Sequence, residues 1–256
     1  MRTDRYQEER RVRIVALLAD RRRMTVDELA RHFNVTGATI RSDLTALMRQ
    51  NKVIRTLGSA MIVDSAPVSP LAERLQIMSA EKRAIGKKAA SLVGPRDIIA
   101  LDASSTSLAM APYLRNLDGL TLVTNCLAVA GEFMNHPQVK VLLPGGHLQH
   151  ESSSIVGRET VEFLKNIRVQ TAFIGARSIG LDTGLCDSDP ASMAFKQALI
   201  KISKKTVALV DSSKWETVSL TTFAGFDQVR TLVTDASIAP ENIRGLNKHG
   251  VKVLVA

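Results

Sequence analysis

Thr36-Gly-Ala-Thr-Ile-Arg-Ser-Asp-Leu-Thr-Ala-Leu47 is the stretch that decides how the first part of this chain folds. Read at the helical period of about 3.6 residues, Ile40, Leu44 and Leu47 fall on one face. The opposite face carries small, polar and basic residues: Gly37, Ala38, Arg41, Ser42 and Thr45. Such a face can approach the major groove of DNA closely and offers donors to bases and phosphates. The alternative interpretation is an ordinary amphipathic surface helix, and the neighbouring residues have to decide between the two.

The residues before this stretch predict two further helices. Residues 6–18 place apolar side chains on one face, which indicates a first helix that ends near Asp20 and is followed by a charged turn, Arg21-Arg22-Arg23. Thr25-Val-Asp-Glu28 is a capping box, in which hydroxyl and carboxylate each satisfy a free backbone N–H at a helix start. The helix that it opens turns Leu29, Ala30 and Phe33 inward, and Thr36 caps the next helix. Two short helices joined by a tight turn form a helix-turn-helix.

Residues 53–63 predict two short strands around Leu57-Gly58-Ser59, which we interpret as a winged hairpin beside the helices. Lys52 and Arg55 at its approach favour contact with the DNA backbone. The alternative is a hairpin that only covers the core. Together these elements predict a winged helix-turn-helix that binds double-stranded DNA through the following residues: Thr25, Thr36, Ala38, Thr39, Arg41, Ser42, Thr45 and Arg55.

Charge is distributed unevenly along the 256 residues. Residues 1–55 hold 13 Lys/Arg against 7 Asp/Glu, a net charge of +6, which leaves +3 of the total +9 for the other 201 residues. Twelve of those 13 cations are arginines, which suit bidentate phosphate contacts. This concentration predicts a polyanionic partner, although a solvated basic face is the simpler alternative.

The composition also bounds where the protein works. No apolar run reaches the length of a membrane span, and the N-terminus opens with charged residues, so we expect a cytoplasmic protein without contact to a membrane. Cys126 and Cys186 have no spacing typical of zinc or redox sites, and we expect both to be reduced and structural. His147 and His150 lack a third ligand and are interpreted as polar loop residues. We therefore expect no metal and no cofactor.

A second domain follows a linker. Residues 64–70 contain two prolines and small polar residues, which continue neither a helix nor a strand. Residues 71–92 predict a connecting helix in which Gly86 is a weak point. Beyond it, seven apolar runs alternate with helical stretches and predict a mostly parallel sheet covered on both faces, at residues 98–101, 120–124, 139–143, 171–174, 207–210, 232–234 and 251–255. We thus expect a DNA-binding domain at 1–63, a linker at 64–70 and an α/β effector-binding and oligomerisation domain at 71–256.

Ligands of such sheets bind at the carboxyl ends of the strands. Four loops there carry suitable residues: Asp102-Ala-Ser-Ser-Thr106, Thr124-Asn125, Gly145-Gly146 and Asp211-Ser-Ser-Lys214. Small polar residues are also what short turns after strands need, so each loop alone is weak evidence. Together they predict a site for a small hydroxylated anion. Lys214 would supply charge, Ser104, Ser105 and Thr106 would cradle a phosphate, and Asp102 or Asp211 would accept from sugar hydroxyls.

These motifs resemble the DeoR family of bacterial transcriptional regulators. Its signature V-S-x-x-T-I-R-R-D-L followed by R-x-H-G-G-A corresponds to Val35-Thr-Gly-Ala-Thr-Ile-Arg-Ser-Asp-Leu44 and Arg55-Thr-Leu-Gly-Ser-Ala60. Ser42 stands where the family has a second arginine, and Leu57 and Ser59 replace its His and Gly. The resemblance continues through Asp-Ala-Ser-Ser-Thr, with Ser104 in place of Gly, and through Leu-Thr-Leu-Val-Thr-Asn, Pro144-Gly-Gly, Phe173-Ile-Gly-Ala, Lys196 and Asp-Ser-Ser-Lys. The glutamate common before the lysine helix is missing from residues 187–192.

The resemblance implies an effector domain similar to sugar-phosphate isomerases and CoA transferases, which senses a phosphorylated sugar or a sugar-derived metabolite. It adds Gly175 and Lys196 to the effector-binding residues, and implies a repressor of a carbohydrate-utilisation operon with no catalytic residues. We expect a homo-oligomer, a dimer or tetramer, on two-fold symmetric operators. Two other classes stay open. One is a sugar-phosphate isomerase with an appended basic domain, which needs a carboxylate base at the substrate carbon. The other is a DNA binder without an effector.

Overall fold

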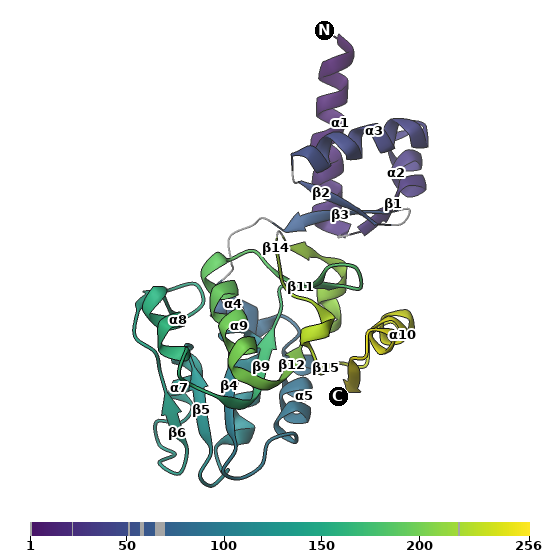
Figure 1. Ribbon diagram of the computed structural model, residues 1–256. Coiled ribbons are helices and arrows are strands. Elements are labelled where there is room, and N and C mark those ends of the chain that lie inside the picture. Colours follow the sequence, from purple (N-terminus) through teal and green to yellow (C-terminus); the bar gives the residue numbers. More distant parts are fainter. Residues whose placement is uncertain (1, 22, 51, 57–58, 65–69, 220) are drawn as a thin grey trace.

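The computed structural model describes residues 2–21, 23–50, 52–56, 59–64, 70–219 and 221–256 (Figure 1). Residues 57 and 58 of the predicted wing turn and residues 65–69 of the predicted linker lie outside the described residues. Figure 1 shows the first three helices and strands gathered apart from the α/β remainder. The predicted fold class is confirmed: a helix-turn-helix precedes an α/β unit with a parallel sheet.

The N-terminal unit is a winged helix-turn-helix. Its elements are α1 Arg2–Arg21, β1 Arg23–Thr25, α2 Val26–Phe33, α3 Gly37–Arg49, β2 Val53–Thr56 and β3 Ser59–Asp64. β2 and β3 pair antiparallel, and β1 adds to the free side of β3. The predicted capping box at Thr25 and Glu28 is present, as is the N-cap at Thr36. The predicted charged turn is wrong in part, because Arg21 ends α1 and Arg23 already pairs with Met61 in the sheet.

The core of this unit is apolar and includes one carboxylate. Ile40, Leu44 and Leu47 of α3 are buried against α1 and α2, as their spacing predicts. Asp43 lies between them on the same inward face and is fully buried. It accepts hydrogen bonds from Arg10 Nε at 2.6 Å and from Arg11 Nε at 3.1 Å. Two arginines of α1 therefore hold α3 in place.

The connection to the second unit is two helices rather than one. α4 Leu71–Gln76 and α5 Ser79–Ala90 meet at Met78, whose φ of 52° interrupts the helical path. Gly86 is not a weak point. It lies inside α5 against α6 Ser105–Met110, and a Cβ added there would come within 2.6 Å of the Ala109 carbonyl oxygen. The glycine thus permits a close approach of two helices that sequence periodicity could not anticipate.

All seven predicted strands form one parallel sheet. Its order is β16-β15-β12-β9-β4-β5-β6, and every neighbouring pair is parallel. The bounds are β4 Ile98–Leu101, β5 Thr121–Thr124, β6 Lys140–Leu142, β9 Val169–Gly175, β12 Ser203–Leu209, β15 Thr231–Thr234 and β16 Lys252–Val255. Alternate residues of a strand face opposite sides, so Ile99 and Leu101 enter one core while Ala100 enters the other.

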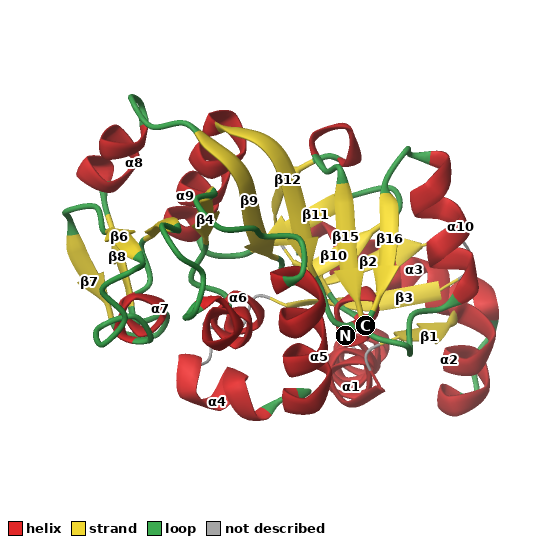
Figure 2. Cartoon of the chain, turned by 90° about the horizontal axis from the view of Figure 1, so that it is seen from below, coloured by secondary structure: helices red, strands yellow, loops and turns green. Residues whose placement is uncertain are grey.

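Helices cover both faces of this sheet (Figure 2). α5 and α6 pack on one face. On the other lie α8 Arg158–Leu164, α9 Pro190–Ile202 and α10 Pro240–Lys248. The remaining helices of the described residues are α7 Leu127–Gly131 and three short 3-10 turns, η1 Ala111–Leu114, η2 Ser212–Glu216 and η3 Phe226–Gln228. Among the described helices, none has the length and apolar character needed to cross a membrane.

Several short strands escaped prediction. β7 His147–Gln149 and β8 Ser154–Val156 form a hairpin, and β10 Ser178–Gly180, β11 Gly184–Asp187 and β14 Thr221–Ala224 form a small antiparallel sheet. β13 Val218–Ser219 pairs in parallel with β3 of the wing, with Val218 opposite Val63 and Ser219 opposite Asp64. The two units of the chain are therefore joined by backbone pairing as well as by residues 65–69.

Candidate functional site

The outward face of α3 is the first candidate site. Ala38, Arg41, Ser42 and Thr45 are exposed, and Thr39 is partly exposed. Thr36 is used locally, because its hydroxyl accepts from the Thr39 backbone N–H at 3.2 Å. The structure brings five of the predicted DNA-binding residues, 38, 39, 41, 42 and 45, onto one helical surface.

Two further predicted DNA contacts lie elsewhere. The Thr25 hydroxyl donates to the Glu28 carboxylate at 2.9 Å and accepts from the Glu28 N–H at 3.1 Å. Hydrogen bonds from the Thr25 backbone and hydroxyl hold the pKa of Glu28 below its usual value. Arg55 belongs to β2, and its side chain lies outside the described part of the structure.

A cavity of about 330 Å³ is the second candidate site. It opens where four adjacent strands of the sheet end, β12, β9, β4 and β5. Asp102 follows β4, Asn125 follows β5, Arg177 follows β9, and Lys214 lies shortly after β12. The volume lies within the range of about 300–1,000 Å³ that is typical of small-molecule sites. The position is the one expected for a ligand of a parallel α/β sheet.

Seven of the twelve predicted effector-binding residues line this cavity: Asp102, Ser104, Ser105, Thr106, Asn125, Lys196 and Lys214. The other five do not line it. Thr124 is fully buried, and its hydroxyl accepts from the Cys126 N–H at 3.1 Å. Gly145 and Gly146 follow β6, the edge strand, and Gly146 packs against β8 with no room for a side chain.

Gly175 and Asp211 support lining residues from behind. The Gly175 N–H donates to Asp102 Oδ2 at 3.0 Å, and a Cβ at Gly175 would lie 2.5 Å from Ser104 Oγ. Asp211 is fully buried and caps η2 by accepting from the Ser213 N–H at 3.2 Å. Its Oδ2 lies 3.9 Å from Lys214 Nζ.

Asp102 is fixed by hydrogen bonds on both oxygens. Its Oδ1 accepts from Ser104 Oγ at 2.7 Å, from the Ser104 N–H at 3.2 Å and from Ser107 Oγ at 2.6 Å. Its Oδ2 accepts from Gly175 and lies 3.6 Å from Lys196 Nζ. The loop after β4 is therefore held rigidly, with the Ser105 and Thr106 side chains at the cavity wall.

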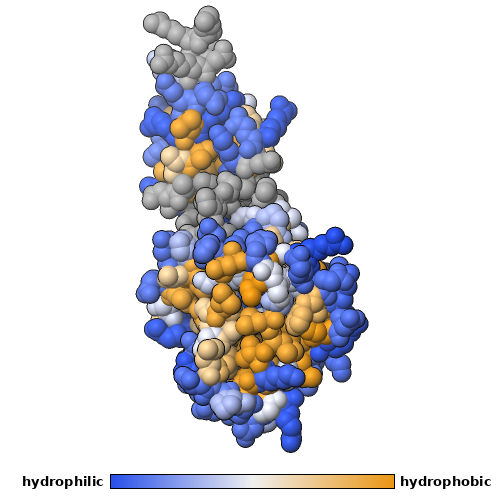
Figure 3. Space-filling model, turned by 90° about the vertical axis from the view of Figure 1, so that its left-hand side faces the viewer, coloured by the Kyte–Doolittle hydropathy of each residue, from blue (hydrophilic) through white to orange (hydrophobic). Residues whose placement is uncertain are grey.

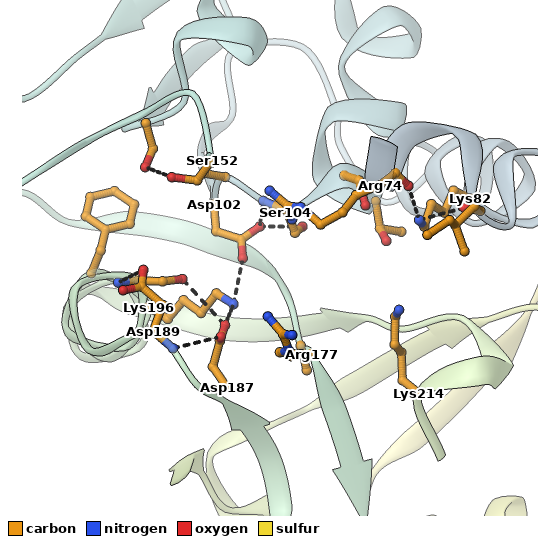
Figure 4. A pocket seen from close by; sticks show the side chains of 18 of the residues that line it. Arg74, Lys82, Asp102, Ser104, Ser152, Arg177, Asp187, Asp189, Lys196 and Lys214 are labelled. Carbon is orange, nitrogen blue, oxygen red and sulfur yellow. Dashed lines mark hydrogen bonds and ion pairs between the residues drawn. The ribbon is translucent and has the colours of Figure 1, made fainter. Parts of the chain in front are cut away.

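Lys196 is a buried cation between two carboxylates (Figure 4). Its Nζ donates to Asp187 Oδ2 at 2.5 Å and lies 5.1 Å from the centre of the Phe223 ring. Burial opposes the positive charge of Lys196, but the negative charges of Asp187 and Asp102 nevertheless raise the pKa of Lys196 above its usual value. Burial likewise opposes ionisation of Asp187, yet Lys196 and the N–H groups of Ser188 and Asp189 hold its pKa below the usual range. Both groups are charged at neutral pH.

Four cations form what we call the cationic end of the cavity: Arg74, Lys82, Arg177 and Lys214. Figure 4 shows them on the side away from Lys196, Asp189 and Ser152. Lys82 donates to the carbonyl oxygens of Arg74 at 2.6 Å and Ile77 at 2.7 Å, which fixes the junction of α4 and α5. Burial and then the charge of Lys214 lower the pKa of Lys82 to about 8. Burial also lowers the pKa of Arg74.

Most residues of this end escaped prediction from sequence. Arg177 is the second residue after β9, so the rule that ligands bind at strand ends could have found it. Arg74 and Lys82 come from helices that precede the sheet, and Asp187 and Asp189 come from a hairpin strand and the loop after it. No spacing in the sequence links these segments to the strand ends. Among the described residues, no group of three or more His, Cys, Asp or Glu side chains could hold a metal ion.

Comparison with known proteins matches both units of the chain. The family described as DeoR-like helix-turn-helix domain matches residues 10–66, and the DeoR C terminal sensor domain matches residues 77–236. The HTH-type transcriptional regulator GolR of Listeria innocua is 32% identical over 97% of this chain and 98% of its own length. The HTH-type transcriptional repressor GlcR of Bacillus subtilis is 32% identical over 98% of this chain and 96% of its own length.

More distant matches include a repressor and a solved enzyme structure. The glycerol-3-phosphate regulon repressor of Escherichia coli is 28% identical over 96% of this chain and 98% of its own length. Ribose 5-phosphate isomerase A of Methanocaldococcus jannaschii aligns with 54% of this chain and 55% of its own, at 19% identity and a TM-score of 0.41.

Proposed function

This chain belongs to the DeoR family of transcriptional regulators, and we propose that it represses a carbohydrate-utilisation operon until a phosphorylated sugar or sugar-derived metabolite binds its cavity. The relatives named as repressors, GlcR and the glycerol-3-phosphate regulon repressor, support this assignment. We assign DNA binding to residues 1–63, a linker to 64–70, and effector binding and oligomerisation to 71–256. The protein would act as a switch and not as an enzyme.

The exposed face of α3 supports DNA recognition. Arg41 and Ser42 stand on it with short neighbours, so the helix can enter a major groove without steric hindrance. Arg10 and Arg11 are engaged with Asp43 and keep α3 at a fixed angle to α1. We propose that α3 reads bases while Thr36 and Arg55 contribute to backbone contacts at its margins.

The cavity supports an anionic, hydroxylated effector. Its lining holds five cations, Arg74, Lys82, Arg177, Lys196 and Lys214, against three carboxylates, Asp102, Asp187 and Asp189. The resulting excess of two positive charges matches a phosphate monoester, which carries about two negative charges at neutral pH. Serine and threonine hydroxyls around the same space can exchange hydrogen bonds with a sugar.

The pairing of β3 with β13 is the observation that carries the proposed switch. η2 holds the cavity residues Ser213 and Lys214. It is connected to β13 by a single residue, Thr217, which also lines the cavity. The Ser219 N–H donates to Ser178 Oγ at 2.8 Å, next to Arg177 of the cationic end. A ligand that moves η2 therefore acts on a strand hydrogen-bonded to the wing. A coupling of about 1–3 kcal/mol would change operator affinity roughly 5- to 150-fold.

Turnover is the rival activity, and the carboxylates of the cavity argue for binding alone. An isomerase needs a base free to accept a proton from substrate carbon. Asp102 already accepts four hydrogen bonds, and Asp187 accepts from two backbone N–H groups as well as from Lys196. Asp189 accepts from the Ser192 N–H and from Gln149 Nε2. Such carboxylates are weak bases, because their hydrogen bonds stabilise the charged form. Incubation of the purified protein with aldose phosphates should yield no ketose phosphate.

We also propose that the repressor is a homo-oligomer. Figure 3 shows apolar atoms gathered on one side of the α/β unit, the side on which α7, α8 and β6 lie. The large apolar side chains exposed on these elements and the adjoining loops are Leu127, Met134, Leu143, Leu148 and Phe163. An exposed cluster of this kind typically marks a protein interface. Light scattering of the purified protein measures the number of chains.

Gel shift against DNA upstream of the protein's own gene tests the proposal. The expected result is a complex that forms better than with random DNA at matched salt and dissociates when one of a panel of sugar phosphates is added. If no fragment exceeds random DNA, the repressor assignment fails. If DNA binds but no sugar phosphate changes binding or raises the melting temperature, the effector assignment fails and a DNA binder without an effector replaces it.

A further inference from the structure

The cavity is polarised, and its two ends differ in the hydrogen bonds that they can make. Figure 4 shows Ser152 and Asp189 on the side opposite the cationic end. The lining residues near them form what we call the acceptor end, which consists of Asn125, Ser152, Ser154, Asp187 and Asp189. The sequence motifs that predicted a phosphate site do not distinguish these two ends. Their chemistry restricts the class of effector further, on the premise of the proposed function that the phosphate binds at the cationic end.

Asn125 is the clearest indicator at the acceptor end. It is only 2% exposed, and its Nδ2 donates to the Ile155 carbonyl oxygen at 2.9 Å, which fixes the direction of the amide. Asn125 lines the cavity, and its Oδ1 is buried with no hydrogen bond from any described residue. Native proteins rarely leave such an oxygen unsatisfied, so it favours a hydrogen-bond donor, which a hydroxyl of a ligand in the cavity can supply.

The charges at this end lead to the same requirement. Lys196 faces Asp187 and Asp102, and Asp189 adds a third carboxylate to the lining. Lys196 is hydrogen-bonded to Asp187, so the carboxylate of Asp189 adds negative charge to the acceptor end. Lys196 donates to Asp187, and its Nζ lies 3.6 Å from Asp102, so this ammonium is engaged by carboxylates of the protein. A ligand carboxylate placed here would meet like charge and an unsatisfied acceptor, whereas a ligand hydroxyl can donate to both.

We infer that the effector is a phosphorylated sugar or polyol that presents hydroxyl groups to the acceptor end, and that the cavity rejects phosphorylated sugar acids of the same length. Asn125 and Asp189 are the residues that determine this specificity. The effector therefore arises from phosphorylation of a neutral sugar or sugar alcohol, without oxidation of the carbon farthest from the phosphate.

Matched pairs of ligands test this inference on the full-length protein. Each pair has the same chain length and differs only in a terminal CH2OH or carboxylate: glycerol 3-phosphate with 3-phosphoglycerate, erythritol 4-phosphate with erythronate 4-phosphate, and glucitol 6-phosphate with gluconate 6-phosphate. Isothermal titration calorimetry should show that the alcohol binds at least tenfold more tightly in every pair that binds. An acid that binds as tightly as its alcohol overturns the inference and leaves the proposed function intact. If none of the six binds, the proposed effector class fails, and the inference fails with it.

A variant of Asp189 tests whether its charge, and not the shape of the cavity, determines the preference for alcohol over acid. Asp189→Asn keeps a residue that caps α9, since Asn is as good an N-cap as Asp, but it removes one negative charge. The preference for alcohol over acid should fall about three- to tenfold, mainly through tighter binding of the acid. Asp182→Asn is the matched control, because Asp182 is exposed and lies outside the lining. An unchanged preference in Asp189→Asn would overturn the assigned role of this residue.

Discussion

The two halves of the chain contain inverse arrangements of the same charges. In the winged helix-turn-helix, one buried carboxylate, Asp43, holds two arginines, Arg10 and Arg11. In the cavity at the strand ends, one buried ammonium, Lys196, is held by two carboxylates, Asp187 and Asp102. The first cluster positions a helix, and the second forms part of the wall of a cavity.

Solvent access separates the two clusters. The side chains of Arg10 and Arg11 are 18% and 19% exposed, so these cations can turn toward water if their partner is removed. The side chains of Lys196, Asp187 and Asp102 are 6%, 9% and 1% exposed. Removing one of these groups leaves an uncompensated charge in a poorly solvated site, which destabilises the fold far more than removing the partner of Arg10 and Arg11. The difference teaches that similar ion clusters contribute differently to stability, and it predicts the order of effects below.

Lys196→Met should have the largest effect on stability. It removes the cation that is hydrogen-bonded to Asp187 and lies beside Asp102, and breaking a buried pair in this way costs about 3–5 kcal/mol. Urea unfolding measures the free energy, followed by fluorescence of the single tryptophan, Trp215, which packs beside the core under α9. Lys201→Met is the control, because Lys201 is exposed on the same helix.

A double variant tests whether charge is the cause. Lys196→Met combined with Asp187→Asn removes both charges and retains an oxygen for the backbone N–H groups of Ser188 and Asp189. It should recover more than half of the lost stability. A single variant that loses less than about 1 kcal/mol would show that the cluster is better solvated than its burial implies.

Asp43→Asn should have the second largest effect, because its arginine partners reach water. We expect a loss of about 1–3 kcal/mol, the contribution of hydrogen bonds to charged groups. Thermal unfolding followed by circular dichroism measures it, with Asp27→Asn as the control on an exposed carboxylate of α2. If Asp43→Asn is as unfavourable as Lys196→Met, solvent access does not explain the difference between the clusters.

Arg41→Ala and Lys214→Ala should separate the two halves functionally. Arg41 is exposed on α3 and Lys214 lies at the cationic end. Arg41→Ala should weaken operator binding by about 1–3 kcal/mol and leave the Kd for effector unchanged. Lys214→Ala should weaken effector binding and leave operator affinity unchanged in the absence of effector. Gel shift and calorimetry measure the two affinities, and equal losses of both in either variant would indicate misfolding instead of separate sites.

The major elements could be predicted because their signals are local. The seven sheet strands are apolar runs bounded by turn residues, and the capping box at Thr25 is a pattern of adjacent residues. The strands of the β7–β8 hairpin have three residues each and mixed polarity, and β13 has two residues, so neither carries a periodic signal. The prediction of a weak point at Gly86 is wrong because the role of this glycine depends on contact with a second helix, at Ala109, which the local sequence does not contain.

The candidate site was predictable only where it follows the sheet. Strand ends identified Asp102, Asn125 and Lys214, because parallel strands bring their carboxyl ends together. Arg74 and Lys82 reach the same cavity from α4 and α5, which depends on how those helices pack on the sheet. Asp43 was detectable, since a charged residue on the apolar face of a helix requires buried partners. Its partners, Arg10 and Arg11, lie more than thirty positions away in the sequence and could not be predicted.

The pH dependence caused by Lys82 should be the smallest of these effects. Because Lys82 lines the cavity, this pH dependence should appear in effector binding and not in DNA binding by α3. The pKa of Lys82 is about 8, below the usual 10.5, because of burial, Lys214 and Arg74, while Asp211 and Glu81 oppose the shift. The unfolded chain therefore binds this proton more tightly, and stability without ligand should rise as pH increases from about 8 to 10.5. A bound anion favours the ammonium, so effector affinity should move in the opposite direction.

Effector affinity should fall as pH rises from 7 to 9, by at most about tenfold, since pH 9 lies one unit above this pKa. Binding near pH 8 should take up protons, which calorimetry detects as a difference in heat between buffers with different ionisation enthalpies. Lys82→Met should abolish this proton uptake, whereas Lys87→Met, at an exposed position of α5, should retain it. Equal heats in both buffers for the unmodified protein would mean that the anion binds away from Lys82. The cationic end would then be reduced to Arg74, Arg177 and Lys214, and the phosphate would lie closer to Ser104.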